Sequence, residues 1–235
     1  VFTGIRRSGK SVMLELVKNE LKKSGVSDRN FLCINFEQFS NSELLDAKIL
    51  HKRIVEFQKI ADGKIYLFFD EIQEVDGWEK CINSCRVDFD CDIYITGSNA
   101  KLLSGELATY LAGRYVEFVI YPFSFAEFLE MNRQKNSQID KSACFTTFLK
   151  TGGMPFLANF LGDDSAKNQY LMDIYNSVVL KDVVKRNNIR DVDTLERIIA
   201  YAFSNIGHIF SATSLSKYFK SEKRNISHDT ILNYL

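Results

Sequence analysis

One octet near the start of the chain restricts its fold more than any other feature. It has the pattern G-x-x-x-x-G-K-S/T, it follows the apolar residues Val1 and Phe2, and its members are Gly4, Ile5, Arg6, Arg7, Ser8, Gly9, Lys10 and Ser11. Because the two glycines lack a Cβ, the backbone can fold back and direct successive N–H groups at phosphate oxygens, together with the N-terminus of the next helix. The octet therefore predicts a phosphate-binding loop between a strand and a helix.

The residue types of the octet suggest a role for its last members. We expect the Lys10 ammonium to reach the β- and γ-phosphates of a nucleotide, and the Ser11 hydroxyl to hold Mg²⁺. The expected nucleotide-binding stretch runs from Gly4 to Val12, which lies at the start of the following helix. Taken alone, the octet also fits a glycine-containing surface turn. Its interpretation therefore depends on an acidic partner farther along the chain.

Such a partner follows an apolar run. Asp70 and Glu71 come directly after Ile65-Tyr66-Leu67-Phe68-Phe69. An unbroken apolar run predicts a strand that is covered on both faces, as in a parallel α/β sheet. We expect Asp70 to bind Mg²⁺ directly or through water, and Glu71 to polarise the water that attacks the γ-phosphate. The alternative is a solvated acidic strand end without a catalytic role.

Helices and strands alternate through the first half of the chain. Apolar periodicity predicts helices over 11–23, 42–61 and 78–86, and strands over 31–36, 65–71, 92–99 and 115–120. This order predicts an α/β fold, a P-loop NTPase core with a parallel sheet flanked by helices and right-handed crossovers. We assign residues 1–133 to this core.

Two further site candidates depend on that order. Ser98 and Asn99 end the strand expected beside the acidic one, where a polar side chain can contact the γ-phosphate and the attacking water. The same residues also fit the cap of a helix that starts near Ala100. Arg114 precedes the last strand and is a candidate arginine finger that acts on the γ-phosphate of a neighbouring subunit in a homo-oligomer. A surface salt bridge explains Arg114 equally well.

The second half of the chain is predicted to be helical. Residues 134–192 are expected to form a helical linker or lid region, with a polar boundary over 132–142 and a hinge at Gly152-Gly153-Met154-Pro155. A simple helix break explains the hinge sequence equally well. Residues 193–235 are expected to begin a winged-helix-like domain, with helices over 193–204, 214–220 and 227–235. Such an element could enter a DNA groove, although its nearby cations are few: Lys220, Lys223 and Arg224. The alternative is a packing or protein-interaction module.

The composition and the two ends of the sequence restrict the binding partners and the cellular compartment that we expect. The 30 Lys and Arg balance the 30 Asp and Glu, so the net charge gives no overall electrostatic attraction to nucleic acid or to an anionic membrane. No run approaches a membrane span, no signal peptide pattern opens the chain, and the five cysteines are scattered in apolar context. We therefore expect a cytoplasmic protein without a membrane partner. Since few residues precede the octet and the last residues stop inside an expected helix, we expect a segment of a longer protein.

Five motifs in order carry a resemblance to a known family. They are G-I-R-R-S-G-K-S, Y-L-F-F-D-E-I-Q, I-T-G-S-N-A-K-L-L, L-A-G-R-Y and Y-P-F-S-F-A-E-F. As far as Leu129, the chain resembles the bacterial and archaeal predicted ATPases of the AAA+ superfamily that carry a C-terminal domain of unknown function. The resemblance implies ATP as the nucleotide, Asp70 and Glu71 as the acidic pair, Ser98-Asn99 as the sensor position and Arg114 as the finger candidate. The absence of an N-K-x-D guanine signature is consistent with adenine.

These observations lead to one expected function and an alternative. The expected function is Mg²⁺-dependent binding and hydrolysis of ATP, coupled to movement of the C-terminal helical and winged-helix region. The alternative is a nucleotide-bound switch or DNA-associated regulator with little turnover. The resemblance also implies nuclease-like activity in a further C-terminal part beyond these residues.

Overall fold

The structure is a computed structural model that describes residues 1–97, 113–135, 137–160, 162–184, 187, 189–224 and 226–235. The chain forms two compact units, Val1–Ile174 and Tyr175–Leu235. The division into 1–133, 134–192 and 193–235 that the sequence suggests stays a prediction. Ser98 and Asn99 lie outside the described residues.

The first unit is built on parallel strands, as the sequence predicts. The strands are β1 (Phe2–Thr3), β2 (Phe31–Asn35), β3 (Ile65–Asp70), β4 (Cys91–Ile95) and β5 (Phe118–Val119). β3 pairs with β2 on one side and β4 on the other, and β1 pairs with β5. A parallel bridge between Phe2 and Thr96 joins β4 to β1, which gives the order β2-β3-β4-β1-β5. β4 therefore lies between the strand before the octet and the acidic strand.

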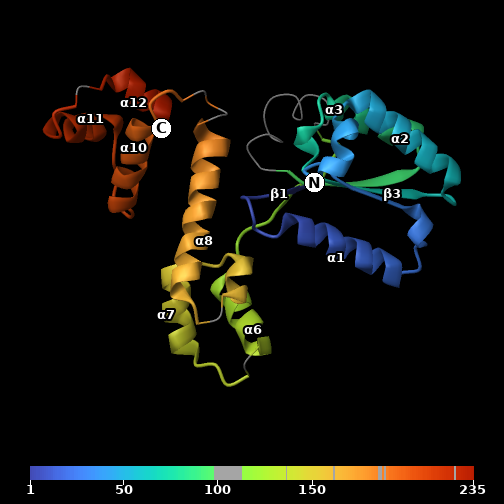
Figure 1. Ribbon diagram of the computed structural model, residues 1–235, viewed down its shortest axis with the longest axis horizontal. Coiled ribbons are helices and arrows are strands. Elements are labelled where there is room, and N and C mark those ends of the chain that lie inside the picture. The colour runs from blue at the N-terminus through green and yellow to red at the C-terminus, as the bar shows by residue number, and fades with distance from the viewer. Residues whose placement is uncertain (98–112, 136, 161, 185–186, 188, 225) are drawn as a thin grey trace. The chain divides into compact units, whose positions relative to one another are not determined.

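Helices cover both faces of the sheet. α1 (Lys10–Lys23) lies on one face, and α2 (Ala47–Ile60) and α3 (Trp78–Asp88) lie on the other (Figure 1). β3 contributes side chains to both layers, since Phe68 packs with Leu14 of α1 while Phe69 belongs to the core formed with α2 and α3. This double burial explains why the β3 sequence is apolar at successive positions. It also fixes the register that sets Asp70 at the end of the sheet.

Two predicted elements of this unit have different bounds in the structure. The helix predicted from residue 42 starts at Ala47, after a 3₁₀ segment, Phe39–Leu45. The Asp46 side chain causes this start, because it accepts hydrogen bonds from the N–H groups of Lys48 and Ile49 as an N-cap. The strand predicted over 115–120 is present as Phe118–Val119, which pairs with β1.

The rest of the first unit is helical. α6 (Phe125–Lys135) and α7 (Lys141–Thr151) pack through a cluster that includes Phe128 and Cys144, and a 3₁₀ segment (Pro155–Asn159) and α8 (Asp164–Ser177) follow. The polar boundary predicted from residue 132 is wrong for its first residues, since α6 continues to Lys135. The Asn132 side chain there donates to the carbonyl oxygen of Phe128 instead of ending the helix.

The second unit contains a small three-helix cluster. After a π-helical segment (Val178–Val184) come α10 (Val192–Ser204), α11 (Ala212–Ser221) and α12 (His228–Tyr234). Asp191, Ser211 and Ser227 cap the three helices, and Leu215, Phe219 and Ile231 form their common core. In the described part of this unit there is no strand, and the winged-helix-like assignment of these helices stays a prediction. Among the described residues, no helix combines the length and apolar character needed to cross a membrane.

Candidate functional site

The octet forms the connection between β1 and α1, and its backbone requires glycine. Gly4 has φ 144° and Gly9 has φ 106°, both in the region that side chains disfavour. A Cβ on Gly4 would also collide with the carbonyl oxygen of Ile120. Arg7 adopts a left-handed backbone with φ 64° although it carries a side chain. The loop therefore holds an unusual conformation that its surroundings must stabilise.

Lys10 lies at the centre of this loop. Its Nζ donates to the carbonyl oxygens of Gly4 at 3.2 Å and Ile5 at 3.1 Å, and its residue is only 4% exposed. The same Nζ lies 3.9 Å from Oε1 of Glu71. The ammonium thus connects the loop to the acidic end of β3, two segments that are distant in sequence.

Asp70 is buried and is fixed by both neighbouring strands. The amide of Asn35, at the end of β2, donates to Oδ2 at 2.9 Å. The hydroxyl of Thr96, just after β4, donates to Oδ1 at 2.5 Å. Both donors are neutral, and each carboxylate oxygen keeps a lone pair for a further ligand. Asn35 and Thr96 are not among the site residues predicted from the sequence. The available signal was a polar residue at the end of each strand beside the acidic one.

Glu71 has an unusual backbone and an unusual environment. It adopts a left-handed conformation with φ 55°, and its N–H donates to Thr96 Oγ1 at 3.0 Å. Burial raises the pKa of the Glu71 carboxyl above its usual range, and the hydrogen bond from Gln73 and the charge of Lys10 only partly offset this effect. The carboxylate is therefore held in a poorly solvated position beside an ammonium group, where its proton affinity is increased.

The remaining members of the octet surround this centre. Ser8 is 3% exposed, and its Oγ has no hydrogen-bond partner among the described residues. A buried hydroxyl without a partner is costly, so an anion inside the loop would satisfy it. Arg6 lies 3.7 Å from Glu37, while Ile5, Ser11 and Val12 are exposed. The hydroxyl of Ser11 and the carboxylate of Asp70 are the oxygen donors that Mg²⁺ prefers, so the residues present fit this ion.

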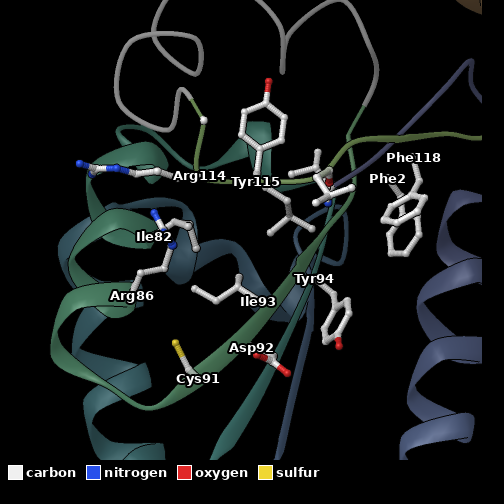
Figure 2. A pocket seen from close by; sticks show the side chains of 14 residues that line it. Phe2, Ile82, Arg86, Cys91, Asp92, Ile93, Tyr94, Arg114, Tyr115 and Phe118 are labelled. Atoms are coloured by element: carbon white, nitrogen blue, oxygen red, sulfur yellow. Dashed lines mark hydrogen bonds between the residues drawn. The ribbon is translucent and has the colours of Figure 1, made fainter.

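Arg114 lies elsewhere. Its Nη1 donates to Asn83 of α3 at 3.3 Å, beside a cavity of about 520 Å³ that α3, β4 and residues 113–118 line. Figure 2 shows Arg114 and Arg86 at this cavity. Arg114 precedes β5, whereas the octet follows β1, and the two strands are parallel. Arg114 and the octet are therefore at opposite ends of the strands, and the chain does not bring Arg114 to its own Lys10 and Glu71.

Together these features define a class of protein. A parallel α/β sheet whose first strand leads into a G-x-x-x-x-G-K-S loop, with an acidic pair at the end of another strand, is a P-loop NTPase fold. The family model described as "AAA domain" matches residues 1–129, which is more than half of the chain. The chain therefore belongs to this AAA domain family. A second model, described as a domain of unknown function, matches residues 143–235.

Two curated relatives match the whole chain. An uncharacterized protein of Haemophilus influenzae is 40% identical over 235 residues, which cover 100% of this chain and 58% of the relative. The uncharacterized protein MJ1544 of Methanocaldococcus jannaschii is 33% identical over 247 residues, which cover 100% of this chain and 53% of that relative. The chain thus spans a little over half the length of these relatives.

Solved structures of low sequence identity also match. AMPPCP-bound DnaA from Aquifex aeolicus has a TM-score of 0.46 at 14% identity, covering 99% of this chain and 79% of that one. The RuvB Holliday junction branch migration motor of Thermotoga maritima has a TM-score of 0.47 at 16% identity, covering 99% of this chain and 76% of that one.

Proposed function

We propose that this chain binds ATP with Mg²⁺ and hydrolyses it at the loop between β1 and α1. The observation that carries the proposal is the position of Lys10 Nζ, which is held by the loop carbonyls and lies 3.9 Å from Glu71. This position puts the Lys10 ammonium, which can bind phosphate oxygens, next to two acidic residues whose carboxylates suit metal binding and proton transfer.

Phosphate binding would use groups that the loop already orients. The backbone N–H groups at the N-terminus of α1 favour negative charge, and Gly9 caps this helix without a side-chain hydrogen bond. On binding, Lys10 Nζ turns from the carbonyl oxygens of Gly4 and Ile5 to the β- and γ-phosphates. The Ser8 hydroxyl gains the partner that it lacks among the described residues. Ile5, Arg6 and Val12 complete the proposed binding stretch.

Ser11 and Asp70 are the residues that would hold Mg²⁺. The ion would neutralise charge on the β- and γ-phosphate oxygens. Asn35 and Thr96 keep the Asp70 carboxylate in one orientation, because each donates to a different carboxylate oxygen. This fixed orientation reduces the rearrangement needed when the site fills.

Glu71 is the proposed general base. Its carboxylate accepts a proton from water as the water oxygen approaches the γ-phosphorus, and the raised pKa makes it a stronger base than an exposed glutamate. Ser98 and Asn99 remain the proposed sensor residues. Arg114 remains the proposed finger for a neighbouring subunit, which agrees with its distance from the site in its own chain.

Two substitutions separate binding from turnover. Lys10→Ala should abolish ATP binding measured by calorimetry, whereas Glu71→Gln should bind ATP and lose turnover by about 10²- to 10⁴-fold in a phosphate-release assay. Glu74→Gln is a matched control, because it makes the same chemical change at an exposed position nearby and should keep wild-type turnover. Failure of the wild-type protein to bind ATP would refute the proposed function. Wild-type turnover in Glu71→Gln would refute only the assignment of the base.

The second candidate function is a nucleotide-bound, DNA-associated regulator that uses the three-helix unit. The favouring observation is the compact α10–α12 cluster, whose exposed cations include Lys220 and Lys223. Two other cations are less available, because Arg197 and Arg224 both form ion pairs with Asp193. A salt-sensitive affinity for duplex DNA that persists in Lys10→Ala would support this function, and equal affinity at low and high salt would oppose it.

A further inference from the structure

Arg7 of the octet contacts a helix outside the α/β core. Its guanidinium carbon lies 5.2 Å from the centre of the Tyr170 ring, over the ring face. Tyr170 belongs to the part of α8 that lies in the first unit. The contact thus joins the loop proposed to bind phosphate to the helical region that follows the core.

The Tyr170 ring is held rigidly by its own surroundings. It is 7% exposed, and its centre lies 5.3 Å from the Phe156 ring and 5.5 Å from the Phe160 ring. Its hydroxyl is buried and has no hydrogen-bond partner in the part of the chain that the structure describes. The ring face, rather than the hydroxyl, is therefore the part of Tyr170 that makes a recognisable contact with the loop.

Arg7 is also the octet residue that most needs support. Its left-handed backbone costs about 1–3 kcal/mol for a residue with a side chain, so a contact that restrains Arg7 stabilises the loop conformation. A guanidinium over an aromatic face is an attractive arrangement, and it is stronger where water is excluded. The Tyr170 ring is buried while Arg7 itself is exposed, so the contact belongs at the lower end of the cation–π range.

We propose that Tyr170 is a positioning residue for nucleotide binding, which holds the phosphate loop in its binding conformation through Arg7 and in turn makes the docking of α8 depend on the nucleotide. The inference rests on the proposed function. Its reciprocal part follows from linkage, because a contact that raises nucleotide affinity is itself strengthened by the nucleotide. Binding energy at the loop is thereby transmitted to the helical region.

The test begins with two substitutions at one position. Tyr170→Leu removes the ring face, and we expect the Kd for ATP in calorimetry to rise about fivefold, the size of a typical cation–π contact. Tyr170→Phe keeps the ring and removes only the unpartnered hydroxyl, so it should bind ATP within twofold of wild type. Phe148→Leu is a control for general loosening of the helical region, because it lies in the α6–α7 cluster away from Tyr170, and it should also bind within twofold. A Tyr170→Leu protein that is folded and binds like wild type would overturn the inference.

A double-substitution cycle identifies Arg7 as the intermediary. Arg7→Gln should weaken ATP binding about fivefold less in the Tyr170→Leu background than in the wild-type background, because the contact is already absent. Arg6→Gln removes the same charge from the neighbouring position and should weaken binding by the same factor in both backgrounds. Equal factors for Arg7→Gln in both backgrounds would contradict the proposed coupling.

Hydrogen exchange tests the reciprocal effect and remains informative if Tyr170→Leu does not fold. Saturating ATP with Mg²⁺ should slow amide exchange in peptides of both α1 and α8 in the wild-type protein. In the Arg7→Gln protein, saturating ATP with Mg²⁺ should slow amide exchange in α1 but not in α8. Protection of α8 that persists in Arg7→Gln would overturn the inference and leave the proposed function intact. Wild-type protein that binds no ATP would instead refute the proposed function.

Discussion

Thr96 contacts both acidic residues of the candidate site through one hydroxyl. It donates to Asp70 and accepts from the N–H of Glu71, and it is fully buried. A single residue after β4 therefore fixes the orientation of the proposed metal ligand and the backbone of the proposed base. The sequence pattern instead suggests Ser98 and Asn99 at this end of the sheet. A threonine that ends a buried strand gives no sign of its partners until strand order is known.

Thr96→Val is the first prediction at this scale. Valine has nearly the same shape but cannot bond Asp70 or accept from the buried N–H of Glu71, so the free energy of unfolding should fall by about 1–3 kcal/mol. Turnover should fall more than ATP affinity, because Glu71 loses its backbone anchor. Urea denaturation and phosphate release measure the two effects. Thr96→Ser keeps the hydroxyl and should retain most of both properties, and a Thr96→Val protein with wild-type stability would contradict the structure.

The raised pKa of Glu71 gives a second prediction with a definite sign. Burial raises this pKa in the folded protein, so the folded state favours the protonated carboxyl. This contribution to stability is fully present below the unfolded pKa and is lost as pH rises through the folded pKa. Glu71→Gln cannot ionise, so without ligand it should become more stable relative to wild type between pH 4 and pH 8.

Two measurements check this dependence. Urea denaturation of both proteins at pH 4 and pH 8 gives the difference in free energy of unfolding at each pH. If wild type instead gains stability relative to Glu71→Gln as pH rises, the attribution to burial is wrong. If the proposed function holds, turnover of the wild-type protein should decline on the acidic side at a pH above that of an ordinary glutamate, because a protonated Glu71 cannot accept a proton.

At the scale of elements, the sequence predicts features that depend on the local residue pattern. It does not predict features that depend on which distant segment an element pairs or packs with. The apolar run of β3 and the octet were sufficient to predict a covered strand, a loop and a helix. The pairing of β5 with β1 was not predictable, because the two strands are distant in the sequence. Asn35 and Thr96 reach Asp70 only through the pairing of β2 and β4 with β3. Tyr170 is still harder to predict, since its contact with Arg7 depends on how α8 packs.

The start of α2 illustrates the same division and is testable. Leu44 and Leu45 fit the helical spacing of the residues after them, yet Asp46 begins the helix by capping it, and Asp76 N–H donates to the carbonyl oxygen of Leu45. Asp46→Ala should lower the free energy of unfolding by about 1 kcal/mol, because it removes the acceptor for the first N–H groups of α2. Asp46→Asn keeps an acceptor and serves as the control in urea denaturation. Equal stability of the Ala and wild-type proteins would show that the cap is unimportant.

At the scale of the whole molecule, the parallel sheet separates Arg114 from the site of its own chain. The octet lies beyond the end of β1, while Arg114 lies before β5, the strand paired with it in the same direction. Its recorded hydrogen bond is to Asn83 of α3, and residues of β1, α3 and β4 line the cavity beside it (Figure 2). For Arg114 to stabilise a γ-phosphate, that phosphate must belong to a neighbouring subunit.

This arrangement predicts that two inactive variants restore activity when mixed. Arg114→Ala should lower turnover by about 10³-fold without weakening ATP binding, since the finger acts on transition-state charge. Glu71→Gln is inactive for a different reason and keeps its arginine. In a mixed assembly, a site with intact Glu71 from the first variant can receive Arg114 from the second. Phosphate release should therefore rise above that of either variant alone and peak at an intermediate ratio.

Arg86→Ala, at the same cavity, is the control and should keep wild-type turnover. Sedimentation with ATP should show the assembly, and mixtures that assemble without regaining activity would exclude a finger supplied in trans.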